Sequence, residues 1–420
     1  MRIRRTIRKY ICLLLTLAVA GMLTGCTSFD NFRRAFIDTE TESSNVIYVG
    51  VFEPESGESK ETGEQEIKGI ELANSNYNTV KGVRVELIKM DTESNTAAAQ
   101  TAIQDLIKMN PVAIIGSTEE ANSMIAAAAV KKAKIPMITP SACNPLITED
   151  NDYMFRACIT YSQRGDGLAE YAIEELESKK IGIITIKNDS TYDAMSSAFK
   201  DRIKKNNKKN KKNRTSIVLD ESVDLNDFDA EALVKAIGKS GADTVFAPVG
   251  LENASKLFDE MEKQGLTDIT VLGNQDWTDS DLLKMAEKHP DIHIAFTTDN
   301  VLNTEDTTES LTAETQRFFI KYANKYGEND EPTQNALLGY DAYMLIINAI
   351  NNADSLDPKD IRDALAETKD LRCATGVYNF DSDGNPIRRV NISTVKDGKI
   401  TTAYVTESSS QSDSMKKIGK

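Results

Sequence analysis

Histidine is nearly absent from this 420-residue sequence, and its cysteines are few and widely spaced. The two histidines, His289 and His293, flank a Pro-Asp turn, and none of the five cysteines forms a Cys-x-x-Cys pair. Zinc sites and general-base catalysis usually draw on such residues. We therefore expect no metal, no cofactor and no histidine-based catalysis, and we expect both histidines to lie at the surface.

Disulfide bonds are not indicated either. When Cys12 and Cys26 near the N-terminus are set aside, three cysteines remain: Cys143, Cys158 and Cys373. An odd number without characteristic spacing gives no disulfide framework.

A surplus of basic residues is also missing, since 50 Lys and Arg stand against 65 Asp and Glu. Nucleic-acid binding needs a basic surface that neutralises phosphates, so we expect no nucleic-acid partner. The main basic run, Lys204–Arg214, contains no aromatic residue for base stacking and lies between a predicted helix and a predicted strand. A solvated loop is the favoured interpretation, with a nucleic-acid arm or a contact with anionic lipid as alternatives.

The apolar run at the N-terminus, Ile11–Leu23, is shorter than the roughly 20 residues that span a bilayer. It follows five basic residues, as the core of a signal peptide does. It ends in Leu23-Thr24-Gly25-Cys26, which resembles the lipobox of bacterial lipoproteins. The resemblance implies cleavage before Cys26, lipidation of Cys26 with acyl chains such as palmitate, and a membrane anchor at the extracytoplasmic face. An ordinary signal peptide with an incidental cysteine is the alternative.

Removal of residues 1–25 would leave 45 basic and 65 acidic residues, a net charge of −20. Such an acidic body suits a protein that must stay soluble outside the cell. Residues 26–45 are polar and rich in Ser, Thr and acids, which predicts a flexible tether. The rest of the chain exceeds one typical hydrophobic core, so we expect two lobes.

Short apolar strands alternate with helical patterns from Val46 onward. Strands separated by single helices predict a parallel sheet that is covered on both faces. The first set comprises strands at 46–52, 83–87, 112–115 and 135–138, with helices around 67–73, 99–107 and 125–130 between them. A second set follows, with strands at 181–186, 216–219, 244–247, 269–272 and 292–296 and helices at 165–176, 192–203, 230–237 and 254–264.

Helices are expected at 311–326, 336–351 and 358–367, followed by a hairpin-like region. The acidic residues of Asp381–Pro386 are spaced as in a calcium loop, but the twelfth position is Ile392 instead of glutamate. A Gly-Asn-Pro turn is therefore the simpler interpretation. Residues 406–420 are expected to be a disordered tail.

Several short motifs, in order along the chain, resemble one known family. They are Gly50-Val51-Phe52-Glu53-Pro54, Gly63-Glu64-Gln65-Glu66 with Gly69–Ala73, Ile114-Ile115-Gly116, Ile135–Pro145 with Phe155-Arg156, Leu338–Ala342 and Phe380–Pro386. The chain resembles the extracellular solute-binding proteins of ABC importers of the leucine/isoleucine/valine-binding type.

This resemblance implies a type I periplasmic-binding fold: two doubly wound α/β lobes with parallel sheets, joined by three crossovers and closing on a solute. The implied lobes are residues 46–160 with 299–370, and residues 161–298 with 371–405. It also implies a monomer that captures a small amino-acid-like or other polar solute and presents it to a membrane permease. A ligand sensor that reports to a membrane signalling receptor is the alternative, and an enzyme is a weaker one.

In this family a Ser-Ala-Thr segment holds the carboxylate of the solute, and Ser141, Ala142 and Cys143 match it. Cysteine replaces a strong hydroxyl donor by a weak thiol. Glu120 stands where the family usually presents serine, and a carboxylate there would repel the carboxylate of an amino acid. Alternatively, Glu120 favours the helix N-terminus and points outward, with Asn122 or Ser123 contacting the solute.

Four further positions match solute contacts of the family less closely. Tyr192 falls at an aromatic contact, although it could instead be a core residue at a helix start. Gln275 aligns with the acidic partner of the solute's ammonium, and Asp276 could substitute for it. Thr62 stands where relatives often have tyrosine. Because the clamp is altered, we expect a solute other than a branched-chain amino acid.

Overall fold

The computed structural model describes residues 46–277, 280–298 and 312–406. The predicted signal peptide, Cys26, the tether and the second of the three crossovers, which we expected around residue 299, lie outside these ranges. None of the helices within them is long and apolar enough to cross a membrane.

The first sheet has six strands in the order β2-β3-β1-β4-β5-β6. Strands β1, β4, β5 and β6 pair in parallel, and β2 and β3 form an antiparallel hairpin. The strands are β1 (Val46–Glu53), β2 (Thr79–Val80), β3 (Val83–Asp91), β4 (Ala113–Gly116), β5 (Met137–Thr139) and β6 (Met154–Arg156). The four parallel strands end at a common edge, where β1 ends at Glu53 and β4 at Gly116.

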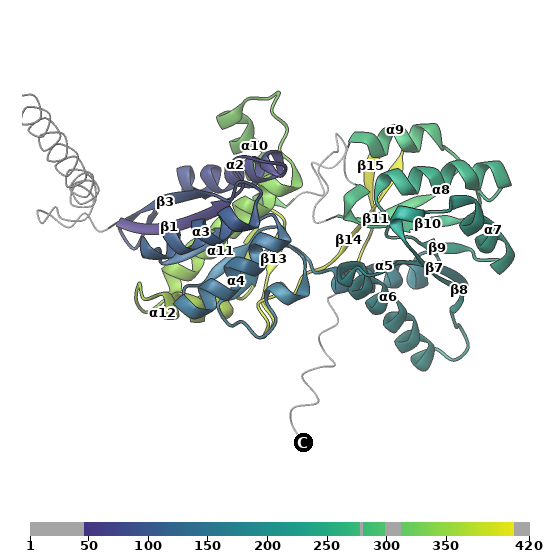
Figure 1. Cartoon of the computed structure of the whole chain (residues 1–420), viewed down its shortest axis with the longest axis horizontal. Helices are drawn as coiled ribbons and strands as arrows, with labels where there is room; N and C mark the ends of the chain where they lie inside the picture. The colour runs from purple at the N-terminus through teal and green to yellow at the C-terminus, as the bar shows by residue number, and fades with distance from the viewer. Residues whose placement is uncertain (1–45, 278–279, 299–311, 407–420) are drawn as a thin grey trace, which may run out of the picture. The chain divides into compact units, whose positions relative to one another are not determined.

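Helices cover both faces of this sheet, as the sequence predicted (Figure 1). Val49 and Val51 of β1 join a core with α2 and α11, whereas the adjacent Phe52 joins a second core with α3 and α4. This alternation follows from the two-residue period of a strand. The helices are α2 (Lys60–Asn76), α3 (Thr96–Lys108), α4 (Glu120–Ala133), α10 (Ala313–Tyr326), α11 (Gln334–Asn352) and α12 (Pro358–Ala366).

Two glycines let α2 and α11 pack backbone against backbone. A Cβ at Gly69 would lie 1.9 Å from the carbonyl oxygen of Ala336, and a Cβ at Gly339 would lie 2.2 Å from that of Glu66. Both contacts are impossible for a larger residue unless the helices separate. The close packing fixes the position of Glu66, which is fully buried on α2.

The second sheet has seven strands in the order β15-β14-β11-β10-β9-β7-β8. Five of them run parallel, and β14 and β15 add an antiparallel hairpin to the edge at β11. The strands are β7 (Lys180–Ile186), β8 (Ser216–Val223), β9 (Thr244–Phe246), β10 (Thr270–Gly273), β11 (Ile294–Thr298), β14 (Asn391–Lys396) and β15 (Lys399–Val405). The packed helices are α5 (Tyr161–Glu174), α6 (Ser190–Lys209), α7 (Ala230–Ser240), α8 (Leu251–Gln264) and α9 (Ser280–Lys288).

The expected fold class is therefore confirmed: two open α/β sheets, each with a parallel core and helices on its faces. The chain passes from the first sheet to the second after β6 and returns after β11. It then contributes β14 and β15, drawn in yellow in Figure 1, to the second sheet.

The predicted boundary at residue 371 is wrong. Strands β12 (Leu371–Cys373) and β13 (Gly376–Tyr378) form a small hairpin whose Cys373, Ala374 and Tyr378 lie in the core of the first lobe. Asp341 of α11 fixes this hairpin, because its carboxylate accepts hydrogen bonds from the backbone N–H groups of Ala374 and Thr375 at 2.7 and 2.8 Å. The second lobe resumes only near Val390.

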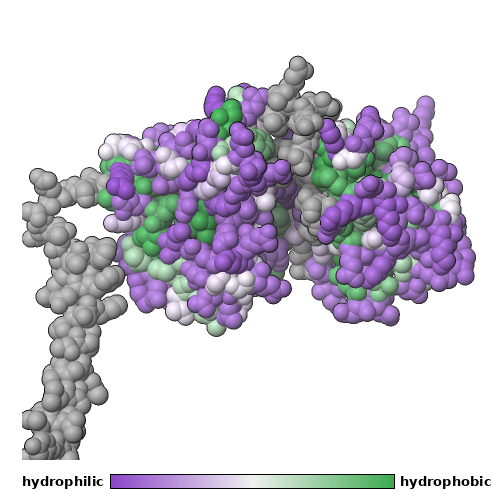
Figure 2. Space-filling view, turned by 90° about the horizontal axis from the view of Figure 1, so that it is seen from above, coloured by the Kyte–Doolittle hydropathy of each residue, from purple (hydrophilic) through white to green (hydrophobic). Residues whose placement is uncertain are grey.

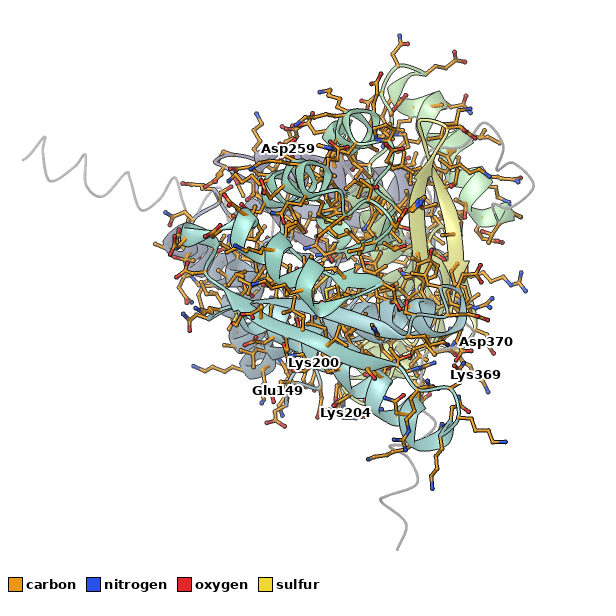
Figure 3. All side chains as sticks on the ribbon, turned by 90° about the vertical axis from the view of Figure 1, so that its right-hand side faces the viewer. Glu149, Lys200, Lys204, Asp259, Lys369 and Asp370 are labelled. Carbon is orange, nitrogen blue, oxygen red and sulfur yellow. The ribbon has the colours of Figure 1, made fainter. Side chains whose placement is uncertain are left out.

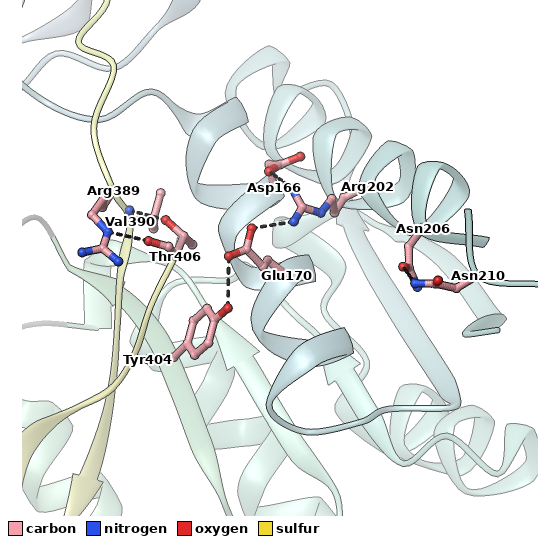
Figure 4. Close-up of polar contacts among 9 residues, drawn as sticks. All are labelled: Asp166, Glu170, Arg202, Asn206, Asn210, Arg389, Val390, Tyr404 and Thr406. Atoms are coloured by element: carbon pink, nitrogen blue, oxygen red, sulfur yellow. Dashed lines mark hydrogen bonds and ion pairs between the residues drawn. The ribbon is translucent and has the colours of Figure 1, made fainter. Parts of the chain in front are cut away.

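The expected start of the disordered tail is also one residue too early. Thr406 is 3% exposed; its hydroxyl accepts from the N–H of Val390 at 2.9 Å, and its carbonyl accepts from Arg389 Nε at 2.7 Å (Figure 4). These bonds join the start of β14 to the end of β15. The remainder of the expected tail lies outside the described residues.

Two other expectations about the second lobe need correction. The basic run Lys204–Arg214 is not wholly a loop, since α6 continues to Lys209, and Asn207 on it exchanges two hydrogen bonds with the backbone of Thr215. Lys200 and Lys204 of the same helix form ion pairs with Asp220 and Asp201 (Figure 3 labels both lysines).

His289 is 1% exposed instead of lying at the surface. It packs edge-on against Phe258, and its Nδ1 lies 3.0 Å from Glu262 Oε2. His293 is exposed as expected. Sequence periodicity missed the burial of His289 because it stands just beyond the end of α9.

Candidate functional site

Polar side chains gather where the parallel strands of the first sheet end. Glu53 closes β1, Thr118 follows β4 by two residues, and Ser141 follows β5 by two residues. In open α/β sheets this edge is the usual position for a bound solute. The face of the molecule shown in Figure 2 is mainly hydrophilic, with scattered apolar patches.

Two carboxyl groups lie behind the hydroxyls of this edge. Glu53 and Glu66 are 1% and 0% exposed. The Ser141 hydroxyl donates a short hydrogen bond to Glu66 Oε1 and lies 3.0 Å from the Thr118 hydroxyl. Glu53 Oε2 accepts from the backbone N–H of Thr118 at 2.8 Å. The strand end, α2 and the loops after β4 and β5 are thus connected through one polar group.

Burial favours the protonated form of both carboxyl groups. Burial raises the pKa of Glu66 to about 7, although hydrogen bonds from Glu53, Ser141 and Thr118 act in the opposite direction. Burial and the negative charge of Glu66 raise the pKa of Glu53 well above its ordinary value. In the described part of the chain, no ion pair joins either carboxylate to a basic side chain. Uptake of a proton would therefore supply the compensating charge that a cation supplies elsewhere.

The segment expected to hold a solute carboxylate has its donors engaged within the protein. The backbone N–H of Ala142 donates to Thr139 Oγ1 at 3.2 Å, and that of Cys143 donates to the carboxylate of Glu120. Ala142 and Cys143 are 1% and 5% exposed. The Cys143 thiol lies in the core, 3.3 Å from Cys158 Sγ, and donates to the carbonyl of Ser141 at 3.1 Å.

Residues at the start of α4 also differ from the expectation. Glu120 does not simply point outward: burial raises its pKa, and the Asn144 side chain and the Cys143 backbone N–H donate to it. Asn122 is 2% exposed and donates to Glu119 Oε2 at 2.5 Å, while Ser123 is fully buried and bonded to Ser117. Asn122 and Ser123 thus face inward, and Glu120 is the partly exposed member.

Thr62 is half-buried in the first turn of α2. It precedes Glu66 by four residues and therefore lies on the same helix face. Sequence reasoning missed Glu53, Glu66 and Thr118 as site residues. Their signal was present, because Glu53 and Glu66 belong to two of the quoted motifs and Thr118 follows a third.

The second lobe brings together a different set of groups. Tyr192, the third residue of α6, is half-buried, and its hydroxyl accepts from Asn274 Nδ2 at 3.2 Å. Asn274 itself is fully buried, and Gln275 next to it is half-buried. Tyr192 also packs on the lobe's core, in line with its interpretation as a core residue at a helix start. The side chain of Asp276 is outside the described set.

Trp277 serves as a core residue in this lobe. It is fully buried, stacks edge-on with Phe258 and donates from its indole N–H to the carbonyl of Val249 at 2.8 Å. Within the described part of the chain, no group of three His, Cys, Asp or Glu side chains could hold a metal ion.

Two open α/β sheets with polar strand-end loops define a two-lobed solute-binding architecture. A family model described as periplasmic binding protein matches residues 46–399, and the chain belongs to that family. It is a solute-binding protein of the leucine/isoleucine/valine type used by ABC transporters.

Curated relatives are distant in sequence. An amino acid binding protein of Pseudomonas aeruginosa is 28% identical over 226 residues, which cover 53% of this chain and 58% of the relative. The chain thus spans less than two thirds of that relative's length. Leu/Ile/Val-binding protein homolog 2 of Brucella abortus is 23% identical over 81% of this chain and 87% of its own.

Solved structures agree in fold. The leucine-binding protein LivK of Thermotoga maritima is 25% identical, with a TM-score of 0.68, over 86% of this chain and 98% of its own. LivJ of Streptococcus pneumoniae, solved with isoleucine, is 26% identical, with a TM-score of 0.68, over 86% of this chain and 99% of its own. A solute-binding protein of R. palustris, solved with 4-hydroxybenzoate, shares the fold at 22% identity, with a TM-score of 0.69, over 87% of this chain and 98% of its own.

Proposed function

We propose that this protein captures a small polar solute at the strand-end edge of its first lobe and presents it to the permease of an ABC importer. The observation that carries the proposal is a cluster of two hydroxyls and two carboxyl groups, from Thr118, Ser141, Glu53 and Glu66. Strand-end loops that lead into helices are where this fold binds solutes. Solute binding is the function that this arrangement supports best.

The solute differs from those of the named neighbours. LivJ was solved with isoleucine, and its relatives carry the names of branched-chain amino acid binders. In this chain the amides of Ala142 and Cys143 are taken by Thr139 and Glu120. An amino-acid carboxylate would meet occupied donors and a negative side chain, which disfavours leucine, isoleucine and valine.

Denaturing mass spectrometry of the purified protein tests the proposal by identifying any solute that co-purifies. A thermal-shift panel of amino acids and other polar metabolites then ranks candidates, because a solute that binds only the folded state raises the melting temperature. We expect a shift of several degrees with the retained solute and little with leucine. A large shift with leucine or valine would contradict the assigned solute class, and the absence of any binder would contradict the function.

Lipid attachment at Cys26 completes the proposal, since it would keep the binder beside its membrane permease. Replacement of Cys26 by serine removes the acceptor thiol, so the protein should move from the membrane fraction to the soluble extracytoplasmic fraction. Cys373→Ser, which changes a cysteine of the first-lobe core, is the matched control and should leave the partition unchanged. An unaltered partition of Cys26→Ser would refute the anchor.

A further inference from the structure

Several backbone donors at the first-lobe edge are engaged within the protein. The backbone N–H of Thr118 goes to Glu53, that of Ala142 to Thr139, and that of Glu119 to Ser117 Oγ at 3.3 Å. In this family an anionic solute is held by such donors, as implied by the match of Ser141, Ala142 and Cys143. An anion placed here would lose water without gaining equivalent hydrogen bonds.

The hydroxyl protons of the edge are directed inward as well. Ser141 donates to Glu66, and the Thr118 side chain also donates within the same group. A hydroxyl carries one proton and two lone pairs, so each hydroxyl is left with acceptor capacity only. Ser141 and Thr118 are both partly exposed, and these lone pairs are therefore available to a solute.

The charged side chains around the edge are mainly acidic. Glu66, Glu119 and Glu120 surround it, and Glu53 lies behind it. The positive charge of Arg156 acts on Glu120, but Arg156 is fully buried and donates to the carbonyls of Ala142 and Asn144. Glu53 Oε1 and Glu66 Oε2, both buried, accept no hydrogen bond from any described N–H or hydroxyl. Negative charge thus exceeds positive charge at this edge.

We propose that the first lobe binds the cationic, hydrogen-donating end of its solute: an ammonium or guanidinium group with no carboxylate on the adjacent carbon. The group donates to Ser141 Oγ, Thr118 Oγ1 and the Glu120 carboxylate. Glu66 acts through Ser141. Because Glu66 accepts the proton of the Ser141 hydroxyl, the Ser141 oxygen can only accept hydrogen bonds from the solute. This inference rests on the proposed function and names its solute class.

Matched compounds test the inference directly. Thermal shift and calorimetry compare 3-methylbutylamine with leucine and 4-methylpentanoate, and agmatine with arginine, all within a metabolite panel sorted by charge. We expect each amine to outrank its parent amino acid by at least about tenfold in affinity, and we expect the best binder of the panel to be a cation. An anion or an amino acid as the best binder would overturn this inference while leaving the proposed function standing. A silent panel with no co-purified solute would overturn both.

Substitutions of glutamate by glutamine test whether the charge of these side chains, as distinct from their shape, is needed for binding. Glu66→Gln keeps the size of the side chain but removes its charge, and it should weaken binding of the best amine about tenfold. Glu64→Gln, at an exposed position of the same helix paired with Lys60, is the control and should change it less than twofold. Circular dichroism and the melting temperature establish folding of each variant, and Glu120→Gln provides a second, partly exposed position. Unchanged amine affinity in both Glu66→Gln and Glu120→Gln would refute the inference.

Discussion

Each lobe buries a glutamate on its first long helix, and the two glutamates have different hydrogen-bond and ionic partners. Glu170 on α5 is 4% exposed; it lies 2.5 Å from the guanidinium of Arg202 and accepts from the hydroxyl of Tyr404 at 3.1 Å (Figure 4). Glu66 on α2 is fully buried and accepts from hydroxyls and from another carboxyl group. Glu170 is paired with a cation within the fold, whereas no basic side chain among the described residues pairs with Glu66 beside the strand-end edge.

This difference separates a structural role from a functional one. A buried charge without a cation costs stability, and such costs persist mainly where function requires them. Arg202 also pairs with Asp166 at 2.9 Å, so the α5–α6 contact is a compact ionic network. Among the described side chains, no ionic network of this kind includes Glu66, which accepts from the Ser141 hydroxyl instead.

The largest expected effect is on the pH dependence of stability. The pKa of Glu66 is about 7 in the folded protein and 4.5 in its ordinary state, so its protonation stabilises the fold fully below pH 4.5. That contribution is lost as the pH rises through about 7, and a shift of this size corresponds to about 3 kcal/mol. Denaturant unfolding between pH 4.5 and 8 should therefore show falling stability.

Glu66→Gln should flatten most of this profile and raise the stability at pH 8, because glutamine has no proton to lose. Glu53, on the neighbouring β1, faces Glu66 and itself feels Glu119, so a smaller slope should remain. Glu64→Gln should reproduce the wild-type slope. If the stability of Glu66→Gln depends on pH as steeply as that of the wild type, protonation of Glu66 does not cause the pH dependence.

An opposite and smaller effect is expected in the second lobe. Glu170→Gln removes the charged partner of Arg202 and should destabilise the protein by about 2 kcal/mol at pH 7, since a charge-assisted hydrogen bond is lost. Solute affinity should stay within twofold. Urea unfolding and calorimetry on the same sample measure both quantities. A stabilised Glu170→Gln variant would remove the contrast between the two carboxylates.

Tyr192→Phe tests the candidate solute contact of the second lobe, where we expect a smaller effect. Its hydroxyl accepts from Asn274, so its removal leaves the buried amide with one acceptor fewer. We expect a stability loss of about 1 kcal/mol and an affinity loss of no more than about fivefold. Tyr404→Phe, which loses a hydroxyl bonded to Glu170, is the control and should not affect affinity. A loss above a hundredfold would make Tyr192 a principal solute contact.

The sequence predicted the sheets and the site's location better than the direction of its hydrogen bonds. Alternating strands and helices, with motifs such as Ser141–Cys143, predicted the fold and the strand-end edge. Periodicity could not reveal that Thr139 occupies the N–H of Ala142, because that contact depends on the side-chain rotamer of Thr139 at the end of β5. Glu66 is a polar residue of an amphipathic helix, so periodicity alone would place it at the surface. The close approach of Gly339 to the Glu66 backbone brings α11 against this part of α2.

The smallest expected effect concerns the thiols of the first lobe. Cys143 and Cys158 are 5% and 1% exposed with their sulfurs 3.3 Å apart, and Cys373 is 3% exposed. Burial also raises the pKa of Cys373 well above its ordinary value, which lowers its thiolate fraction. Iodoacetamide should leave all three unlabelled in the native protein at pH 8 and modify them in urea, as measured by intact mass. Rapid native labelling at Cys143, prevented by bound solute, would instead place its thiol in the solute site.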